Sequence, residues 1–159
     1  MKNYEKTGIL KKNDLKIPSK KQLKKGVAII ECIQKIPCNP CVDICPVNAI
    51  TMKDINSPPE VNYDKCIGCK KCVGICPGLA IFVVKILDKN KAFVTLPYEQ
   101  LPIPEENDIV DGLNREGKKI DNVKVKKVIK KGKTMIITVE TEEKYAMDIR
   151  NIRVKNEKK

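Results

Sequence analysis

The sequence predicts an α+β protein in which a small cysteine-rich domain of two related halves is followed by a small, antiparallel, β-barrel-like domain. All eight cysteines lie between Cys32 and Cys76, inside an internal repeat. The residues after that repeat contain no cysteine and follow the alternating pattern of short strands. We therefore expect a basic arm with a short helix at 1–26, the cysteine-rich domain at 27–87 and the all-β domain at 88–159.

Composition limits how this chain of 159 residues can be stabilised and where it works. Apolar residues make up 42% and aromatic residues only 4%, so the core must be mostly aliphatic. Small domains with little core usually need disulfides or metals. No apolar run is long enough to span a membrane, and we expect no signal peptide. We therefore expect a cytoplasmic protein, in which cysteines are thiols or metal ligands.

The first 26 residues form the basic arm, with nine lysines against Glu5 and Asp14. Within it, Ser19 and Gln22 have the spacing of a capping box, and Gly26 can end the helix. These signals predict a short helix over Lys20–Lys25. The charge of the arm fits either a solvated tail or a segment that docks on an acidic protein surface.

The repeat gives the cysteine-rich domain its expected symmetry. Each copy reads as a strand, a cysteine-rich loop and a second strand, and Ser57-Pro58-Pro59 marks the turn between copies. The expected strands are Val27–Glu31 and Ile50–Lys53 in the first copy, and Glu60–Asp64 and Ile81–Leu87 in the second. This pattern predicts two half-domains related by a pseudo-two-fold axis.

The segment after the repeat reads as strands separated by turns. We expect strands at Ala92–Leu96, Asp108–Leu113, Val123–Ile129, Met135–Thr141 and Ala146–Val154. Several short strands at this spacing are typical of a small antiparallel barrel. The stretch from Leu96-Pro97 to Ile103-Pro104 is rich in proline and is expected to be a connecting segment.

The second cysteine loop carries the clearest chemical signal in the chain. Cys66, Cys69, Cys72 and Cys76 follow the pattern C-x2-C-x2-C-x3-C-P, which ends at Pro77. The tight spacing allows three thiolates to hold three corners of one iron–sulfur cubane. The longer last gap and the proline direct the fourth cysteine away from it.

The first cysteine loop departs from this pattern at its beginning. Cys38, Cys41 and Cys45 keep the x2 and x3 gaps and are followed by Pro46, but Lys35 stands where the first cysteine would fall. Cys32 lies three residues earlier, so the loop must bulge outward if Cys32 is a ligand. Cys32 is therefore the least secure of the eight candidate ligands.

Residues 27–84 resemble a bacterial dicluster ferredoxin, and this resemblance implies a ferredoxin-like fold with two 4Fe–4S clusters. In such proteins the fourth cysteine of each run ligates the other cluster. The resemblance implies that cluster I is held by Cys32, Cys38, Cys41 and Cys76, and that cluster II is held by Cys66, Cys69, Cys72 and Cys45. Electron transfer is the function that it implies.

The first loop carries a second resemblance. The phrase from Glu31 to Cys41, with Pro37, Asn39 and Pro40, resembles small ferredoxin-like subunits of multi-subunit FAD-dependent amino-acid and related dehydrogenases. This resemblance implies an electron-transfer subunit that works beside a FAD-containing partner and is not catalytic alone. The 72 residues after the cysteine-rich domain also favour a fixed subunit over a mobile carrier.

Several alternatives stay open. Two zinc sites of four cysteines each would also use C-x2-C pairs, although zinc does not require the full run. A free-standing soluble ferredoxin would need little beyond the clusters. A nucleic-acid-binding protein with structural clusters would use the basic arm, but the low aromatic content disfavours it. The chain contains no His, which excludes His-based acid–base catalysis.

Overall fold

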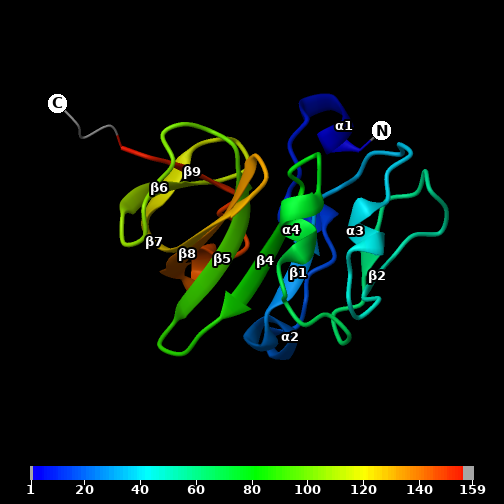
Figure 1. The fold of residues 1–159 in the computed structure, drawn as a ribbon, viewed down its shortest axis with the longest axis horizontal. Helices are drawn as coiled ribbons and strands as arrows, with labels where there is room; N and C mark the ends of the chain where they lie inside the picture. The colour runs from blue at the N-terminus through cyan, green and yellow to red at the C-terminus, as the bar shows by residue number, and fades with distance from the viewer. Residues whose placement is uncertain (1, 156–159) are drawn as a thin grey trace.

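The computed structural model describes residues 2–155, which form a mixed α/β molecule with one large antiparallel sheet (Figure 1). The cysteine-rich loops lie beside one edge of this sheet, next to β1 and β4. The sheet has seven strands in the order β1-β4-β5-β8-β7-β6-β9, and a separate two-stranded sheet pairs β2 with β3. The strands are β1 Val27–Ile30, β2 Ile50–Thr51, β3 Glu60–Val61, β4 Ile81–Ile86, β5 Lys91–Tyr98, β6 Ile109–Leu113, β7 Lys119–Lys131, β8 Thr134–Glu142 and β9 Asn151–Arg153.

The helices are short and lie mostly in the first half of the chain. They are α1 Asn3–Thr7, α2 Lys20–Lys25, α3 Pro40–Asp43 and α4 Lys71–Ile75, with 3-10 turns at Lys12–Asp14 and Glu143–Tyr145. The helix predicted at Lys20–Lys25 is confirmed as α2. Ser19 Oγ accepts from the Gln22 amide at 3.3 Å, Gln22 Oε1 accepts from the Ser19 amide at 2.9 Å, and Gly26 ends the helix with φ 90°. Among the described residues, no helix is both long and apolar enough to cross a membrane.

The prediction of a barrel-like second domain is wrong. Among the described residues the sheet does not close, because β1 and β9 are its two edges. The strands β5 to β9 do not form a sheet of their own, since β5 pairs with β4 of the cysteine-rich region along Val83–Ile86. Lys89 and Asn90, with φ values of 58° and 56°, form a tight turn between these strands. The sheet therefore continues across the boundary expected between residues 87 and 88.

Several predicted boundaries also differ from the structure, among them those of the last strand and of the proline-rich connection. The strand expected at Ala146–Val154 is limited to β9, because Tyr145 accepts turn hydrogen bonds from the amides of Asp148 and Ile149. The proline-rich connection begins later than expected, since β5 continues through Pro97, which lies opposite Ile136 of β8. The ladder with β4 ends at Thr95, so Pro97 lies beyond the part of β5 that is paired on both sides.

The two copies of the repeat are joined strand to strand. β1 of the first copy pairs with β4 of the second, and β2 pairs with β3. α3 and α4, which lie within the two cysteine-rich loops, pack against each other. These pairings are what two related half-domains require, and the pseudo-two-fold axis itself stays a prediction.

The core is aliphatic, as the composition predicts, and it connects the sheet with the cysteine-rich region. Its largest fully buried side chains come from both parts of the chain: Ile29, Ile81, Leu96, Ile137, Ile149 and Ile152. The basic arm lies against both parts. Tyr63 Oη donates to the Lys16 carbonyl at 2.7 Å, and Lys12 and Lys20 pair with Asp148 and Glu143 at 2.6 and 3.0 Å.

Candidate functional site

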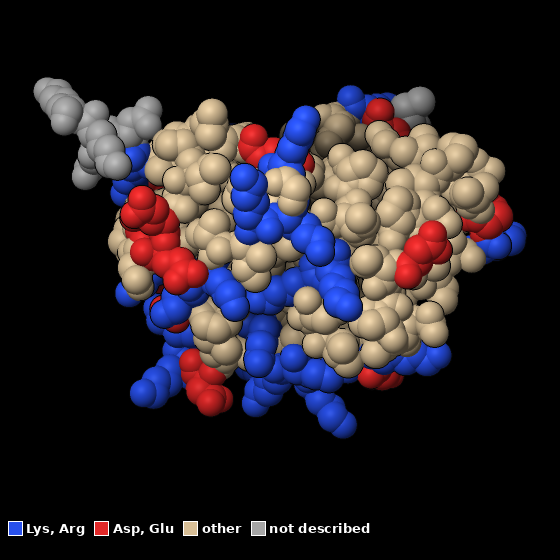
Figure 2. Space-filling view, in the orientation of Figure 1, with Lys and Arg blue, Asp and Glu red and all other residues tan. Residues whose placement is uncertain are grey.

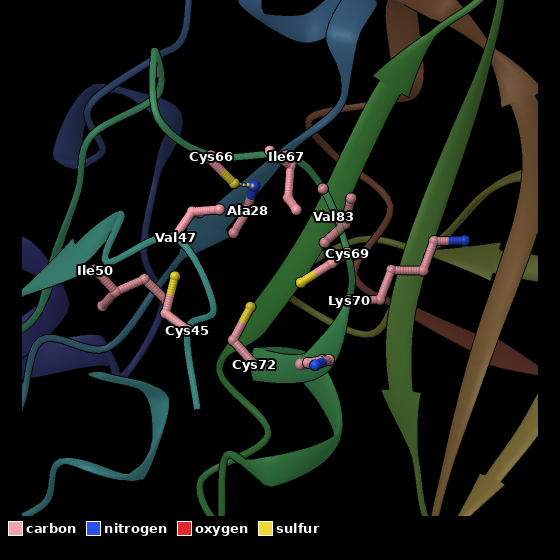
Figure 3. Close-up of a pocket in the computed structure, with 12 residues that line it drawn as sticks. Ala28, Cys45, Val47, Ile50, Cys66, Ile67, Cys69, Lys70, Cys72 and Val83 are labelled. Atoms are coloured by element: carbon pink, nitrogen blue, oxygen red, sulfur yellow. Dashed lines mark hydrogen bonds between the residues drawn. The ribbon is translucent and has the colours of Figure 1, made fainter. Parts of the chain in front are cut away.

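The structure gathers the eight free thiols into two groups, and each group contains cysteines from both loops. The second thiol group surrounds one cavity and consists of Cys45, Cys66, Cys69 and Cys72 (Figure 3). Cys45 comes from the first loop and the other three come from the second. Its sulfur points toward those of Cys66 and Cys72 in the same cavity.

The first thiol group consists of Cys32, Cys38, Cys41 and Cys76. Cys32, Cys38 and Cys76 line one groove, which is also lined by Tyr4 and other residues of the arm. We group Cys41 with them because, after burial, the nearby charges of Cys76 and Cys38 raise the pKa of its thiol. The displaced Cys32 thus lies with Cys38 and Cys76, in the group to which the ferredoxin resemblance assigns it. Within residues 2–155 no three Cys, Asp or Glu side chains are spaced for a single metal ion.

The local structure of each loop places its last cysteine beside the thiols of the other loop. Pro40 occupies the first turn of α3, where its missing N–H costs no helical hydrogen bond. Cys41 lies inside α3 and Cys72 inside α4, whereas Cys45 and Cys76 follow the ends of these helices. Because α3 and α4 pack against each other, the cysteine that leaves each helix lies beside the thiols of the other loop.

Burial and mutual repulsion oppose ionisation of the inner thiols. Burial, followed by the charges of Cys66 and Cys69, raises the pKa of Cys72 to about 12. Burial, followed by the charges of Cys76 and Cys38, raises the pKa of Cys41 to about 11. Several thiolates in one such group are stable only around a positively charged centre, which a metal cluster supplies. The donor set therefore fits an iron–sulfur cluster in each group.

Backbone amides support the sulfur atoms of the second thiol group. The Ala49 amide donates to Cys45 Sγ at 3.2 Å, and the Ala28 amide of β1 donates to Cys66 Sγ at 3.3 Å. Burial opposes ionisation of Cys45, but the amides around it, led by that of Val47, outweigh burial and lower its pKa. Such donors stabilise thiolate ligands and favour the reduced state of a bound cluster.

Gly68 lets the second loop approach the end of α2 closely. Its φ is 64°, and a Cβ at this position would lie 2.8 Å from the backbone oxygen of Gly26. Neither the conformation nor the distance suits a side chain. Gly68 therefore allows the loop that carries Cys66 and Cys69 to lie against the junction of α2 and β1.

We expect Gly68→Ala to destabilise the protein and impair cluster incorporation. Gly132→Ala is the matched control, because Gly132 has φ 63° but open space around its Cβ position. The control should lose about 1–2 kcal/mol from the conformation alone. Gly68→Ala should lose about 1–3 kcal/mol more, because the added methyl group displaces backbone. Thermal unfolding and bound iron measure the two effects, and equal losses in both variants would contradict the close-approach argument.

The sequence does not predict one group of interacting residues near the first thiol group. Glu31, directly before Cys32, accepts hydrogen bonds from Arg115 Nη2 and Arg150 Nε, both at 2.6 Å. The side chains of Glu31 and Arg150 are only 8% and 4% exposed. Arg150 also donates to the Ile149 carbonyl at 2.6 Å and lies over the Phe82 ring. Arg115 and Arg150 are far apart in the sequence, and nothing in their spacing predicts that both contact Glu31.

Comparison with known proteins identifies the cysteine-rich region. A family model described as a 4Fe-4S dicluster domain matches residues 31–80, the segment that contains all eight cysteines. No curated protein and no solved structure matches the chain. The match supports an iron–sulfur, ferredoxin-like protein that binds 4Fe–4S clusters and functions in electron transport. The prediction of a ferredoxin-like domain is confirmed to this extent.

Proposed function

We propose that this chain is an electron-transfer subunit that holds two 4Fe–4S clusters and works beside a FAD-containing dehydrogenase subunit. The observation that carries the proposal is the sharing of cysteines between the loops. Cys45 lies with the second loop's cysteines, and Cys76 lies with those of the first. Each thiol group then offers four sulfur ligands, the number that one 4Fe–4S cluster takes.

In this proposal, cluster I is held by the first thiol group and cluster II by the second. Bound there, the clusters would supply one-electron oxidation and reduction. The chain itself holds the thiolates in place and shields three of the eight from water, since Cys41, Cys66 and Cys72 are buried. Amide donors to Cys45 and Cys66 stabilise the negative charge of the second group.

A fixed subunit is favoured over a mobile carrier by the way the rest of the chain is built. The large sheet shares β1 and β4 with the cysteine-rich region, so it is part of the support of the clusters. The loop from Glu31 to Cys41 resembles small subunits of FAD-dependent dehydrogenases. The arm lines the groove of the first thiol group with Tyr4, Ile9 and Leu10. An acidic surface of the flavoprotein would meet the lysines that the arm carries elsewhere. A cytoplasmic location also belongs to this proposal.

Isolation of the untagged protein with its natural partners tests the proposed function. The chain is purified without oxygen from its own cells, and the copurifying proteins are examined for bound flavin. We expect a flavoprotein in a constant ratio to this chain, and electrons from its reduced flavin should appear in the clusters by EPR spectroscopy. A cluster-loaded chain that runs alone would instead support a free-standing ferredoxin. Salt-sensitive retention of DNA or RNA would support the nucleic-acid alternative.

A further inference from the structure

A set of lysines lies beside the second thiol group, and Figure 2 shows a face of the molecule on which basic side chains gather. Basic side chains form a band across the middle of this face, where Figure 1 places α4, β4 and β5. We define the lysine face as five lysines that the second loop, β4 and β7 contribute beside the second thiol group: Lys70, Lys71, Lys85, Lys127 and Lys131.

The members of the lysine face come together only in the tertiary structure. Lys70 extends away from the cysteine sulfurs (Figure 3), and its Nζ donates to Thr138 Oγ1 of β8 at 3.2 Å. Lys85 of β4 lines the same groove as Lys70. Lys131 of β7 approaches α4, because its Cγ lies 3.1 Å from the Cβ position of Gly74. Three separate segments thus contribute positive charge around the second loop.

The charges of the lysine face are not compensated within the described part of the chain. None of its five lysines forms an ion pair with a carboxylate of residues 2–155. Glu140, two residues along β8 from Thr138, pairs with Lys126 at 3.9 Å instead. Lys127 of β7 lies opposite Thr138 of β8, the residue to which Lys70 donates its hydrogen bond. Like charges held together in this way are costly unless a partner supplies the opposite charge.

The lysine face also borders the most accessible part of the second thiol group. Cys69 is exposed, although Cys66 and Cys72 beside it are buried. Ile67, which lines the cavity of this group, is 54% exposed. An exposed apolar side chain with lysines around it is a common design for a protein-binding surface, with an apolar centre and a charged rim.

We propose that the lysine face docks an acidic protein surface, which exchanges electrons with the chain through the exposed Cys69 end of the second thiol group. The inference rests on the proposed electron-transfer function and adds a second docking surface, distinct from the basic arm. Carboxylates of the partner would lie against Lys85, Lys127 and Lys131. A protein is favoured over a small anion because the lysines spread over a face rather than enclose one pocket. Nucleic acid is a separate possibility that the experiment must distinguish.

The test compares two triple variants of the cluster-loaded chain. Lys85→Gln/Lys127→Gln/Lys131→Gln removes charge from the lysine face. Lys118→Gln/Lys119→Gln/Lys144→Gln removes the same charge from lysines outside the basic arm that already pair with carboxylates. Both variants leave every cysteine and both lysines of the second loop in place. Iron content and EPR spectra establish that each protein holds its clusters, so a missing cluster would count against the proposed function and not against the docking surface.

Binding is measured by fluorescence anisotropy with a labelled oligoglutamate peptide and with a single-stranded DNA of equal charge. At low salt we expect the lysine-face variant to bind oligoglutamate about tenfold more weakly than the control variant, with the difference lost at high salt. Cluster reduction by the anionic dithionite radical should slow in the same variant, while reduction by the methyl viologen cation should not. Equal oligoglutamate binding by the two variants would overturn the proposal, and so would tighter binding of DNA than of oligoglutamate.

Discussion

Cys45→Ser is expected to remove the cluster of the second thiol group, although Cys45 belongs to the first loop in sequence. Its sulfur lies in one cavity with those of Cys66, Cys69 and Cys72, and it accepts a hydrogen bond from the Ala49 amide. Serine keeps the shape of cysteine but does not supply a thiolate. The variant should lose about half of its iron, since each thiol group would hold one of two equal clusters. Iron analysis and EPR spectroscopy of anaerobically purified protein measure this loss.

Cys76→Ser is the matched control for this crossed arrangement. Cys76 is the corresponding cysteine of the second loop, and it lines the groove of Cys32 and Cys38. This variant should damage the first cluster and leave the spectrum of the second. If each serine variant instead damaged the cluster of its own loop, the crossed assignment would be wrong. If both variants lost all iron, the two clusters would depend on each other for assembly, and the iron left after mild reconstitution would identify the damaged group.

Arg150→Met is expected to destabilise the whole protein by about 3 kcal/mol, because it leaves the buried Glu31 carboxylate with one arginine instead of two. Arg150 connects several parts of the fold. Its Nε binds Glu31 beside the first thiol group, its Nη1 donates to the carbonyls of Ala146 and Ile149, and its guanidinium lies 4.9 Å from the centre of the Phe82 ring. Methionine fills much of the space but makes none of these polar contacts.

The expected fall in melting temperature is about 6–12 °C for a chain of this size. Arg153→Met is the matched control, because Arg153 is exposed and makes one long hydrogen bond, to the Gly117 carbonyl at 3.3 Å. Its melting temperature should change by about 2 °C at most. Circular dichroism follows unfolding of the sheet, and visible absorbance follows loss of the clusters. Equal melting temperatures for the two variants would show that the Glu31 contacts do not stabilise the fold.

Local signals in the sequence were sufficient for several features. Ser19, Gln22 and Gly26 predicted α2 with its bounds, because helix capping involves only residues within one or two turns. The eight cysteines predicted the ferredoxin-like region that the dicluster family model matches. The alternation of Met135 to Thr141 predicted β8, because the side chains of a strand alternate between its two faces.

Features that depend on pairing between distant strands were predicted less well. The lengths of the last five strands and the turns between them are typical of a small barrel, and they predict one. Strand length, however, does not determine which strands pair. One edge of β4 pairs with β1, and the tight turn at Lys89 and Asn90 allows β5 to pair with the other edge. The strands of the second half of the chain therefore extend the sheet of the cysteine-rich region, and this sheet is open among the described residues. Asp88-Lys89-Asn90-Lys91 was the local signal that could have indicated this turn.

The sequence by itself determined which atoms this protein offers for chemistry: eight thiols in two spaced runs, the basic arm and no histidine. The ligand spacing is local, since three thiols of one short loop can reach one cluster. Only the tertiary structure decided what surrounds these thiols. It buried Glu31 with Arg115 and Arg150 beside the first group, and it brought lysines of β4 and β7 to the second. Such contacts join residues far apart in the chain, and their energies depend on burial and distance, which no pattern of neighbouring residues contains.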